Sequence, residues 1–99
     1  MNLIVEERVQ QALRHLQRAD GAKVIQAFDR LQAMDLEGLR HSNKTAKLAG
    51  PRPDMFVYKA TPRLRILFRY QHRNEPSLII EDIVSHDLLE RHFSSRKAQ

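Results

Sequence analysis

The sequence predicts an α+β fold in which two N-terminal antiparallel helices pack on one face of a small, curved antiparallel sheet. In the first third of the chain, apolar residues recur every three or four positions, as they do along one face of a helix. In the second half, three runs of strand-forming residues are separated by short segments that are typical of turns. Between these regions lies a stretch rich in Ser, Asn, Gly and Pro, which is typical of a loop.

Two helices joined by a tight turn are expected at the start of the chain. Residues 5–18 and 22–34 each carry one apolar stripe. Asp20 and Gly21 interrupt the pattern, so Asp20 is a candidate cap for the second helix. Residues 1–5 are a candidate for a short edge strand. The stripes consist of Val5, Val9, Ala12, Leu13 and Leu16 in the first helix and Val24, Ala27, Phe28, Leu31 and Met34 in the second.

A basic loop is expected over residues 39–54, after the helices. The segments between the strands that follow are short enough for antiparallel hairpins. Residues 87–93 are expected to form one or two helical turns, and residues 94–99 a frayed tail. The expected strands are residues 55–60, 64–70 and 78–84.

The middle strand has the clearest pattern, because its apolar and basic residues alternate. Side chains point to opposite faces of a strand in turn, so the apolar set is predicted to lie under the helices and the basic set on the open face. The open face is therefore a predicted binding surface for phosphates. Tyr58 and Tyr70 could stack on bases there or belong to the core. The apolar set is Leu64, Ile66 and Phe68, and the basic set is Arg63, Arg65 and Arg69.

Composition excludes several classes of protein. A chain of 99 residues predicts a single domain over 1–99 with a small core. It contains no cysteine, which excludes disulfides, thiolate zinc sites and thiol nucleophiles. No apolar run approaches the roughly 18 residues that span a bilayer, and acids follow too soon after the start for a secretory signal. These two observations lead us to expect a soluble, cytoplasmic protein. The histidines lack metal-ligand spacing, so no metal or other cofactor is expected.

Positive charge is concentrated in the middle of the chain. The formal net charge is +5, and from Arg40 to Arg73 there are nine Lys or Arg and one acid, Asp54. Such a block favours a polyanionic partner, although a solvated basic face or a solubilising loop is the alternative. The candidate nucleic-acid-binding residues are Lys44, Lys47, Arg52, Arg63 and Arg69.

Several short motifs occur along the chain in a fixed order. Lys47-Leu48-Ala49-Gly50 precedes the strands, Phe56 is followed by Lys59, Arg65 opens the run Ile66-Leu67-Phe68, and a late strand ends at His86. This ordered set, over roughly residues 5–93, resembles the RelE/ParE superfamily of bacterial toxin–antitoxin toxins, and its HigB/RelE-like branch in particular. The resemblance implies a RelE/ParE-like two-layer sandwich with a short C-terminal helical element.

The resemblance also implies an mRNA endoribonuclease that works on the ribosome without metal, the 2′-hydroxyl of the RNA attacking the adjacent phosphorus. At the matching positions, Arg65 would hold the phosphate with its planar, permanently charged fork. His86 would transfer a proton, since an imidazole titrates near neutral pH. Lys59 would be a second contact to the phosphate or the leaving group. The implied partners are a cognate antitoxin, the ribosome and its mRNA.

Two positions depart from the nuclease pattern. Asp87 stands where many ribosome-dependent members have an Arg beside the late His, and Phe93 is the nearest aromatic to the place of a C-terminal Tyr. An acid beside the site repels phosphate. Two alternatives therefore stay open: a ParE-like inhibitor of DNA gyrase, and a non-catalytic basic module that binds RNA or a partner.

The two central candidates also have structural alternatives. Arg65 could form an ion pair with Glu81 or Asp82 on the neighbouring strand. His86 could be a partly buried histidine that is held by hydrogen bonds.

Overall fold

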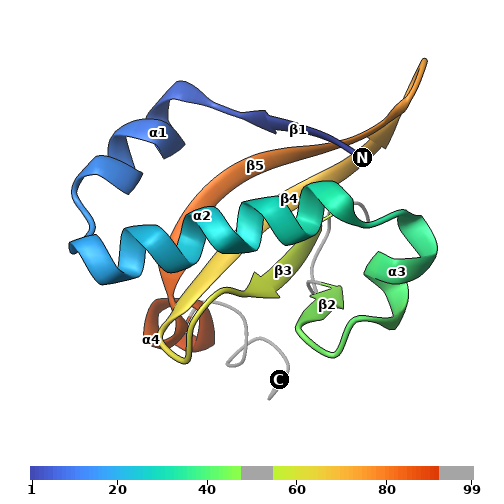
Figure 1. The fold of residues 1–99 in the computed structure, drawn as a ribbon. Helices are drawn as coiled ribbons and strands as arrows, with labels where there is room; N and C mark the ends of the chain where they lie inside the picture. The colour runs from blue at the N-terminus through green and yellow to red at the C-terminus, as the bar shows by residue number, and fades with distance from the viewer. Residues whose placement is uncertain (48–54, 92–99) are drawn as a thin grey trace.

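The computed structural model describes residues 1–47 and 55–91 (Figure 1). One five-stranded mixed sheet has the strand order β1-β5-β4-β3-β2. The strands are β1 (Asn2–Val5), β2 (Thr45–Lys47), β3 (Met55–Lys59), β4 (Leu64–His72) and β5 (Pro76–Ser85). The helices are α1 (Glu7–Arg14), α2 (Arg18–Ala33), α3 (Leu36–His41) and α4 (His86–Leu89). The predicted α+β class and the two-layer arrangement are confirmed.

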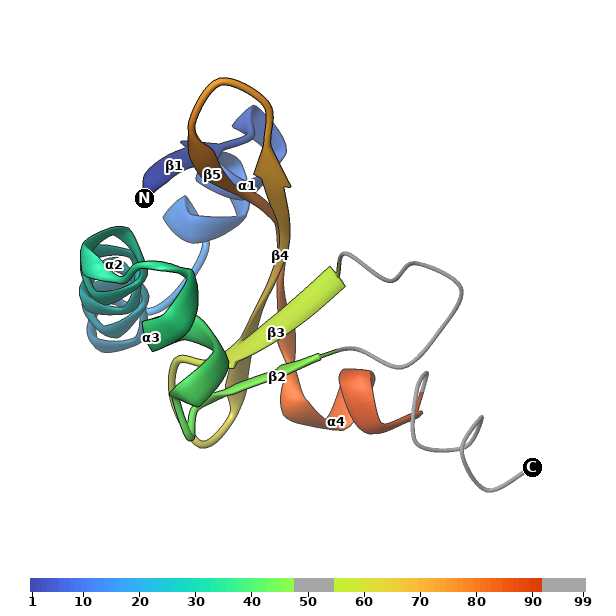
Figure 2. The ribbon, with the colours of Figure 1, turned by 90° about the vertical axis from the view of Figure 1, so that its right-hand side faces the viewer.

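The core lies between the helices and one face of the sheet. Figure 2 shows α2 and α3 on one side of the sheet and α4 on the other. Ile66 and Phe68 of β4 have no exposed surface, as the alternation predicts, and Phe68 stacks on Phe56 with ring centroids 5.7 Å apart. The buried cluster is Val9, Val24, Ala27, Phe28, Leu31 and Leu39 from the helices and Tyr58, Ile66, Phe68, Leu78 and Ile80 from the sheet.

The break between the first two helices lies earlier than the sequence suggests. The chain turns at residues 15–17, and α2 begins at Arg18 and continues through Asp20 and Gly21. The Gly21 N–H donates to the Gln17 carbonyl at 2.8 Å, which is an ordinary helical bond. A glycine inside a helix is less favourable than alanine by only about 1 kcal/mol. Burial of the α2 apolar stripe stabilises the helix by more than that. The prediction that Asp20 caps the second helix was therefore wrong.

Residues 39–54 were predicted as one loop, and this was wrong for part of it. Helix α3 extends to His41, because the Asp35 carboxylate caps it by accepting from the Gly38 N–H at 2.7 Å and because Leu39 is fully buried. Strand β2 then pairs antiparallel with β3. A six-residue helix with one buried anchor is too short for a periodic pattern to be recognised. Residues 48–54 and the expected tail at 94–99 lie outside the described residues.

The sheet differs from the prediction at one edge. The candidate edge strand forms as β1, but it runs parallel to β5, with Leu3 opposite Leu78, so the sheet is mixed. The pairing of β4 with β5 shifts by one residue between Leu67 and Phe68. Leu67 is opposite Asp82, whereas Phe68 is opposite Ile80. Glu81 is the extra residue of this β-bulge. No helix within the described ranges is both long and apolar enough to cross a membrane.

We expect the two faces of β4 to respond differently to truncation. Ile66→Ala should lower the free energy of unfolding by about 2–5 kcal/mol, because it leaves a cavity in the sealed core. Leu67→Ala, the adjacent position on the open face, should lower it clearly less. Urea titrations of both variants provide the measurement. An equal or larger loss for Leu67→Ala would show that β4 faces the opposite way.

Candidate functional site

Arg65 and His86, 21 positions apart, meet at one end of the sheet. Arg65 lies opposite Val84 in the β4–β5 register, and His86 follows directly after β5 as the first residue of α4. Ser85 caps this helix by accepting from the Leu88 N–H at 3.0 Å. Arg65 Nη2 is 3.2 Å from His86 Nδ1. The end of β5 and the short helix therefore hold the imidazole against the guanidinium.

This contact sets the tautomer of His86. A guanidinium can only donate, so Nδ1 accepts and the ring proton lies on Nε2. Nε2 in turn lies 3.9 Å from a carboxylate oxygen of Glu90. The imidazole therefore presents a donor, not an acceptor, on the side away from Arg65.

The rest of the Arg65 guanidinium is held by the turn between β3 and β4. Nη1 donates to the carbonyls of Thr61 at 2.7 Å, Leu64 at 3.2 Å and Pro62 at 3.3 Å. Within residues 1–47 and 55–91, Arg65 makes no ion pair, so the alternative of a bridge to the acids of β5 does not occur there. In this arrangement Arg65 fixes the turn with one nitrogen and orients His86 with the other.

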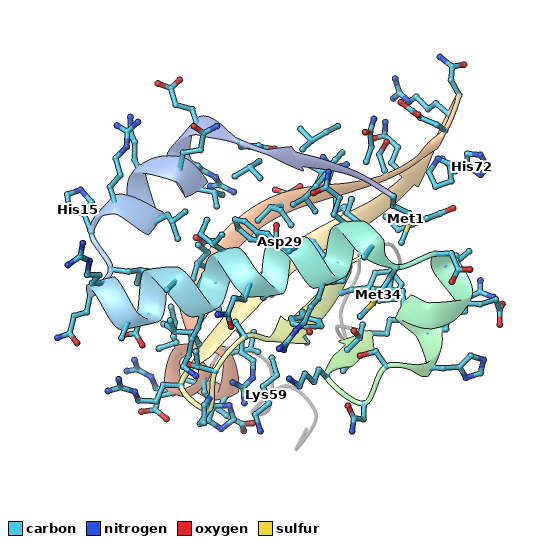
Figure 3. The ribbon with its side chains drawn as sticks, viewed as in Figure 1. Met1, His15, Asp29, Met34, Lys59 and His72 are labelled. Atoms are coloured by element: carbon cyan, nitrogen blue, oxygen red, sulfur yellow. The ribbon has the colours of Figure 1, made fainter. Side chains whose placement is uncertain are left out.

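Lys59 is the third residue at this end of the sheet. It lies directly opposite Arg65 in the β3–β4 register, so their side chains leave the same face. Its backbone N–H donates to the Lys44 carbonyl at 2.8 Å, which fastens the end of β3 to the segment before β2. Figure 3 shows Lys59 at the end of β3, below α2 in that view. The structure thus brings together the three residues proposed for the chemistry.

The other two arginines of the strand have acidic partners. Arg63 was predicted to point to the open face, but it forms an ion pair with Asp20 of α2 at 3.8 Å. Arg63 precedes β4, and the alternation of side chains between the two faces of the strand does not extend into the turn. Arg69 forms an ion pair with Glu81, whose side chain is only 15 % exposed. Arg8 also reaches Glu81, at 3.5 Å. Two cations thus share one carboxylate, which reduces the charge available to a phosphate.

A small hollow lies beside His86. It has a volume of about 130 Å³ and is lined by Pro62, Arg63, Ser85, His86 and Asp87. Asp87, noted in the sequence as a departure from the nuclease pattern, therefore lies where a phosphate would approach the histidine. Among the described residues, no three His, Asp or Glu side chains gather closely enough to hold a metal ion.

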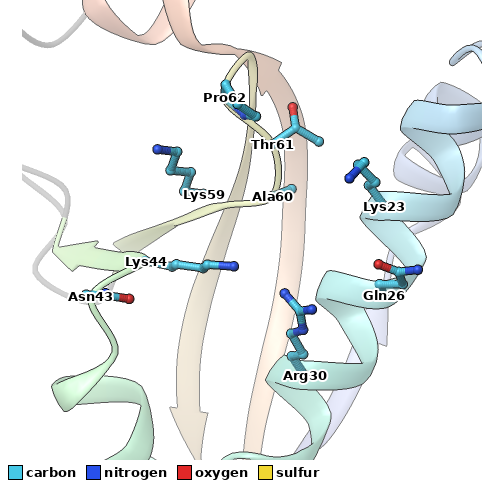
Figure 4. A pocket seen from close by; sticks show the side chains of 9 residues that line it. All are labelled: Lys23, Gln26, Arg30, Asn43, Lys44, Lys59, Ala60, Thr61 and Pro62. Carbon is cyan, nitrogen blue, oxygen red and sulfur yellow. The ribbon is translucent and has the colours of Figure 1, made fainter.

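A larger groove opens between α2 and the strand ends, and we call it the basic groove (Figure 4). Its volume is about 450 Å³. The groove includes a stripe of α2 that the sequence reading missed, although the i, i+3, i+7 spacing of its polar residues is visible in the sequence. It is lined by Lys23, Gln26 and Arg30 from α2, by Asn43 and Lys44, and by Lys59, Ala60, Thr61 and Pro62.

The remaining candidates do not join one surface. Lys47 lines a separate hollow of about 300 Å³ beside α3 and β2, and Arg52 lies outside the described residues. Tyr58 is 1 % exposed and belongs to the core. Tyr70 packs against that core and contacts His72 edge-on, with centroids 6.5 Å apart. Tyr58 therefore offers no open ring on which a base could stack, and Tyr70 is partly buried.

No protein-family model matches the sequence, and no curated protein matches it. A YoeB/ParE toxin from Agrobacterium tumefaciens superposes with a TM-score of 0.66 at 18 % identity, over 87 % of this chain and 99 % of the toxin. The chain has the RelE/ParE toxin fold.

Two further solved structures agree with this fold. The archaeal RelE–RelB complex from Pyrococcus horikoshii gives a TM-score of 0.65 at 16 % identity, over 85 % of this chain and 92 % of the other. A conserved hypothetical protein from Helicobacter pylori gives 0.54 at 13 % identity, over 88 % and 96 %. The RelE/ParE-like sandwich that the sequence resemblance implied is thereby confirmed as a fold.

The Arg69–Glu81 pair should be energetically coupled. A double-mutant cycle with Arg69→Met and Glu81→Gln should give a coupling free energy of about 0.5–3 kcal/mol, because the two side chains are only 26 % and 15 % exposed. The same cycle on the surface pair Arg40–Glu37, 62 % and 69 % exposed, should give about 0.5 kcal/mol or less. Urea unfolding measures both. Equal couplings would contradict a stronger interaction in the Arg69–Glu81 pair.

Proposed function

We propose that this chain is the toxin of a toxin–antitoxin pair and that it cleaves messenger RNA on the ribosome without a metal ion. The observation that carries the proposal is the convergence of Lys59, Arg65 and His86 at one end of the sheet. The RelE/ParE fold supports it, since the YoeB/ParE neighbour is a toxin.

The chemistry would be an internal displacement at phosphorus. The RNA 2′-oxygen forms a bond to the adjacent phosphorus while the bond to the 5′-oxygen breaks, which leaves a 2′,3′-cyclic phosphate and a 5′-hydroxyl. One proton leaves the 2′-hydroxyl and one joins the departing 5′-oxygen. The protein must therefore stabilise negative charge at the phosphate and exchange protons with these two oxygens.

Arg65 and His86 would exchange partners when RNA binds. A phosphate that takes the Nη2 donor of Arg65 releases Nδ1 of His86, which at present accepts from it. The freed imidazole nitrogen can then take up a proton during the reaction. Lys59, exposed and opposite Arg65, would add positive charge at the same phosphate. The three carbonyls at Nη1 keep the arginine in place during the exchange.

A cognate antitoxin is the proposed protein partner. The Pyrococcus horikoshii neighbour is a RelE–RelB complex, and the net charge of +5 would favour an acidic segment on the antitoxin. The ribosome and its mRNA are the proposed nucleic-acid partners, since both are polyanions.

One observation favours a second candidate. Asp87 lines the hollow beside His86, and a carboxylate there opposes phosphate binding. A ParE-like inhibitor of DNA gyrase, or a module that binds RNA or a partner without cleaving, would not need that hollow. Induction of the chain in cells separates the candidates. The nuclease predicts cuts within ribosome-bound messages and unchanged DNA supercoiling; loss of gyrase supercoiling with intact messages would identify the gyrase inhibitor instead.

Removal of the Arg65 guanidinium should slow cleavage by about 10²–10³-fold in single-turnover assays on ribosome complexes, by analogy with other donors to an oxyanion. Arg65→Lys should restore only part of the rate, because an ammonium keeps the charge but loses the planar fork. Arg73→Ala, an exposed cation of the distant β4–β5 hairpin, is the control and should cleave at the parental rate. If folded Arg65→Ala is as fast as the parent, Arg65 has no part in the reaction.

His86→Gln should slow cleavage by about 10²–10⁴-fold, the usual contribution of a general acid or base. The amide of Gln can form hydrogen bonds but cannot exchange a proton near neutral pH, so the variant separates the two roles. Single-turnover assays on ribosome complexes measure both rates. A parental rate for folded His86→Gln would show that another group moves the proton.

A further inference from the structure

Two sets of cations have contrasting surroundings in the structure. One group is neutralised by carboxylates, while the cations of the basic groove take part in no ion pair within residues 1–47 and 55–91. None of the described residues that line the groove is acidic. The paired cations are Arg8 and Arg69 with Glu81, Arg63 with Asp20, and Arg40 with Glu37. The unpaired cations that line the groove are Lys23, Arg30, Lys44 and Lys59.

The groove gathers these cations from three separate segments. In α2, Lys23, Gln26 and Arg30 fall on one stripe, because positions three, four and seven apart share a helix face. Lys44 precedes β2 on the opposite wall, and Figure 4 shows its side chain and that of Arg30 extending toward each other across the gap. The bond from the Lys59 N–H to the Lys44 carbonyl, 2.8 Å long, fixes that wall to the end of β3.

Like charges around one groove repel each other, and an anion between them would turn this repulsion into attraction. The rest of the described lining is polar or small, with Gln26 and Asn43 as neutral hydrogen-bonding groups and Ala60 and Pro62 as its apolar residues. An antitoxin segment anchored by apolar side chains would find little to bury against there. A phosphodiester backbone, by contrast, needs cations and hydrogen-bond donors, and both are present.

Lys59 connects this groove to the Arg65–His86 site. It lines the groove and also lies directly opposite Arg65 across the β3–β4 pair. We propose that the basic groove binds the backbone phosphates of an RNA strand that continues from the Arg65–His86 site. The inference rests on the proposed function in that the strand is RNA, but it concerns binding and not cleavage. Arg30 and Lys44 then bind phosphates away from the one that reacts.

The test uses the full chain and a short fluorescein-labelled single-stranded uridine RNA, with affinity measured by fluorescence anisotropy over a series of salt concentrations. The double variant Arg30→Gln/Lys44→Gln should bind more weakly and should have a smaller slope of log K against log salt. Each lost phosphate contact on a single strand lowers the slope by about 0.7, so the double variant should lose about 1.4.

The matched control is Arg14→Gln/Arg73→Gln, which removes the same total charge from exposed positions outside the groove. His15 is adjacent in sequence to Arg14, and His72 to Arg73. In Figure 3 these two histidines lie at the two ends of the molecule, away from Lys59. The control should keep the parental slope to within about 0.3, well under one contact. In cleavage assays the groove variant should raise KM and leave kcat unchanged, because its contacts are equally strong in the ground and transition states.

The outcomes distinguish this inference from the proposed function. Equal effects of the groove and control variants, or no RNA binding by the parental chain, would overturn the groove assignment. So would a groove variant that loses affinity for a poly-glutamate peptide but keeps affinity for RNA, since that result identifies an acidic protein partner. Groove-dependent RNA binding by a chain that leaves messages intact would instead support the groove and contradict the nuclease.

Discussion

The burial of Ile66 and Phe68 is the constraint on which the rest of the structure depends. Both side chains are sealed under the helices, so a slip of β4 by one residue would bury Arg65 and expose the core. The register that avoids this cost also places Lys59 opposite Arg65. Because β5 pairs with the same strand, its end delivers His86 to the Arg65 guanidinium. The arrangement of the candidate site is thus a consequence of how the core packs.

Electrostatics then divides the basic residues by location. Arg69 lies beside the β-bulge that turns Glu81 toward it, and Arg8 of α1 reaches the same carboxylate, so this pair of cations ties the first helix to the sheet. Such partly buried pairs are costly to break, because a lone charge would be left away from water. Among the described residues that line the basic groove, no acid plays this part. Positive charge therefore remains available to a partner along the α2 side of the groove, in addition to Arg65 and Lys59 at the end of the sheet.

Much of the fold could be predicted because its main helices and strands have clear patterns of apolar residues in the sequence. The alternation in β4 and the apolar stripes of the first two helices each repeat several times, so they specify element type and facing together. The helix boundary near Gly21 could not be predicted, since a glycine in a helix is only a weak breaker and the buried stripe outweighs it. Helix α3 and strand β2 are too short for a period to appear, and they form because Leu39 is buried and β3 offers an edge.

The candidate site was predictable in part for a related reason. That Arg65 and His86 lie at the same end follows from antiparallel pairing of two consecutive strands, which the sequence indicates. The acidic partners of Arg63 and Arg69 could not be predicted from the sequence. Packing of α2 brings Asp20 to Arg63. A β-bulge that no local pattern reveals brings Glu81 to Arg69. Lys23 and Arg30 were missed because only the apolar face of their helix was considered.

The central claim is that the RNA supplies its own nucleophile while Lys59, Arg65 and His86 act on the phosphate. The most direct test replaces the 2′-hydroxyl of the nucleotide on the 5′ side of the mapped cut with hydrogen, in a message held on the ribosome. We predict that the unmodified message gives a 2′,3′-cyclic phosphate and a 5′-hydroxyl, and that the 2′-deoxy message stays intact at that bond. Cleavage of the deoxy message at the unmodified rate would contradict the account, because a water molecule would then be the nucleophile.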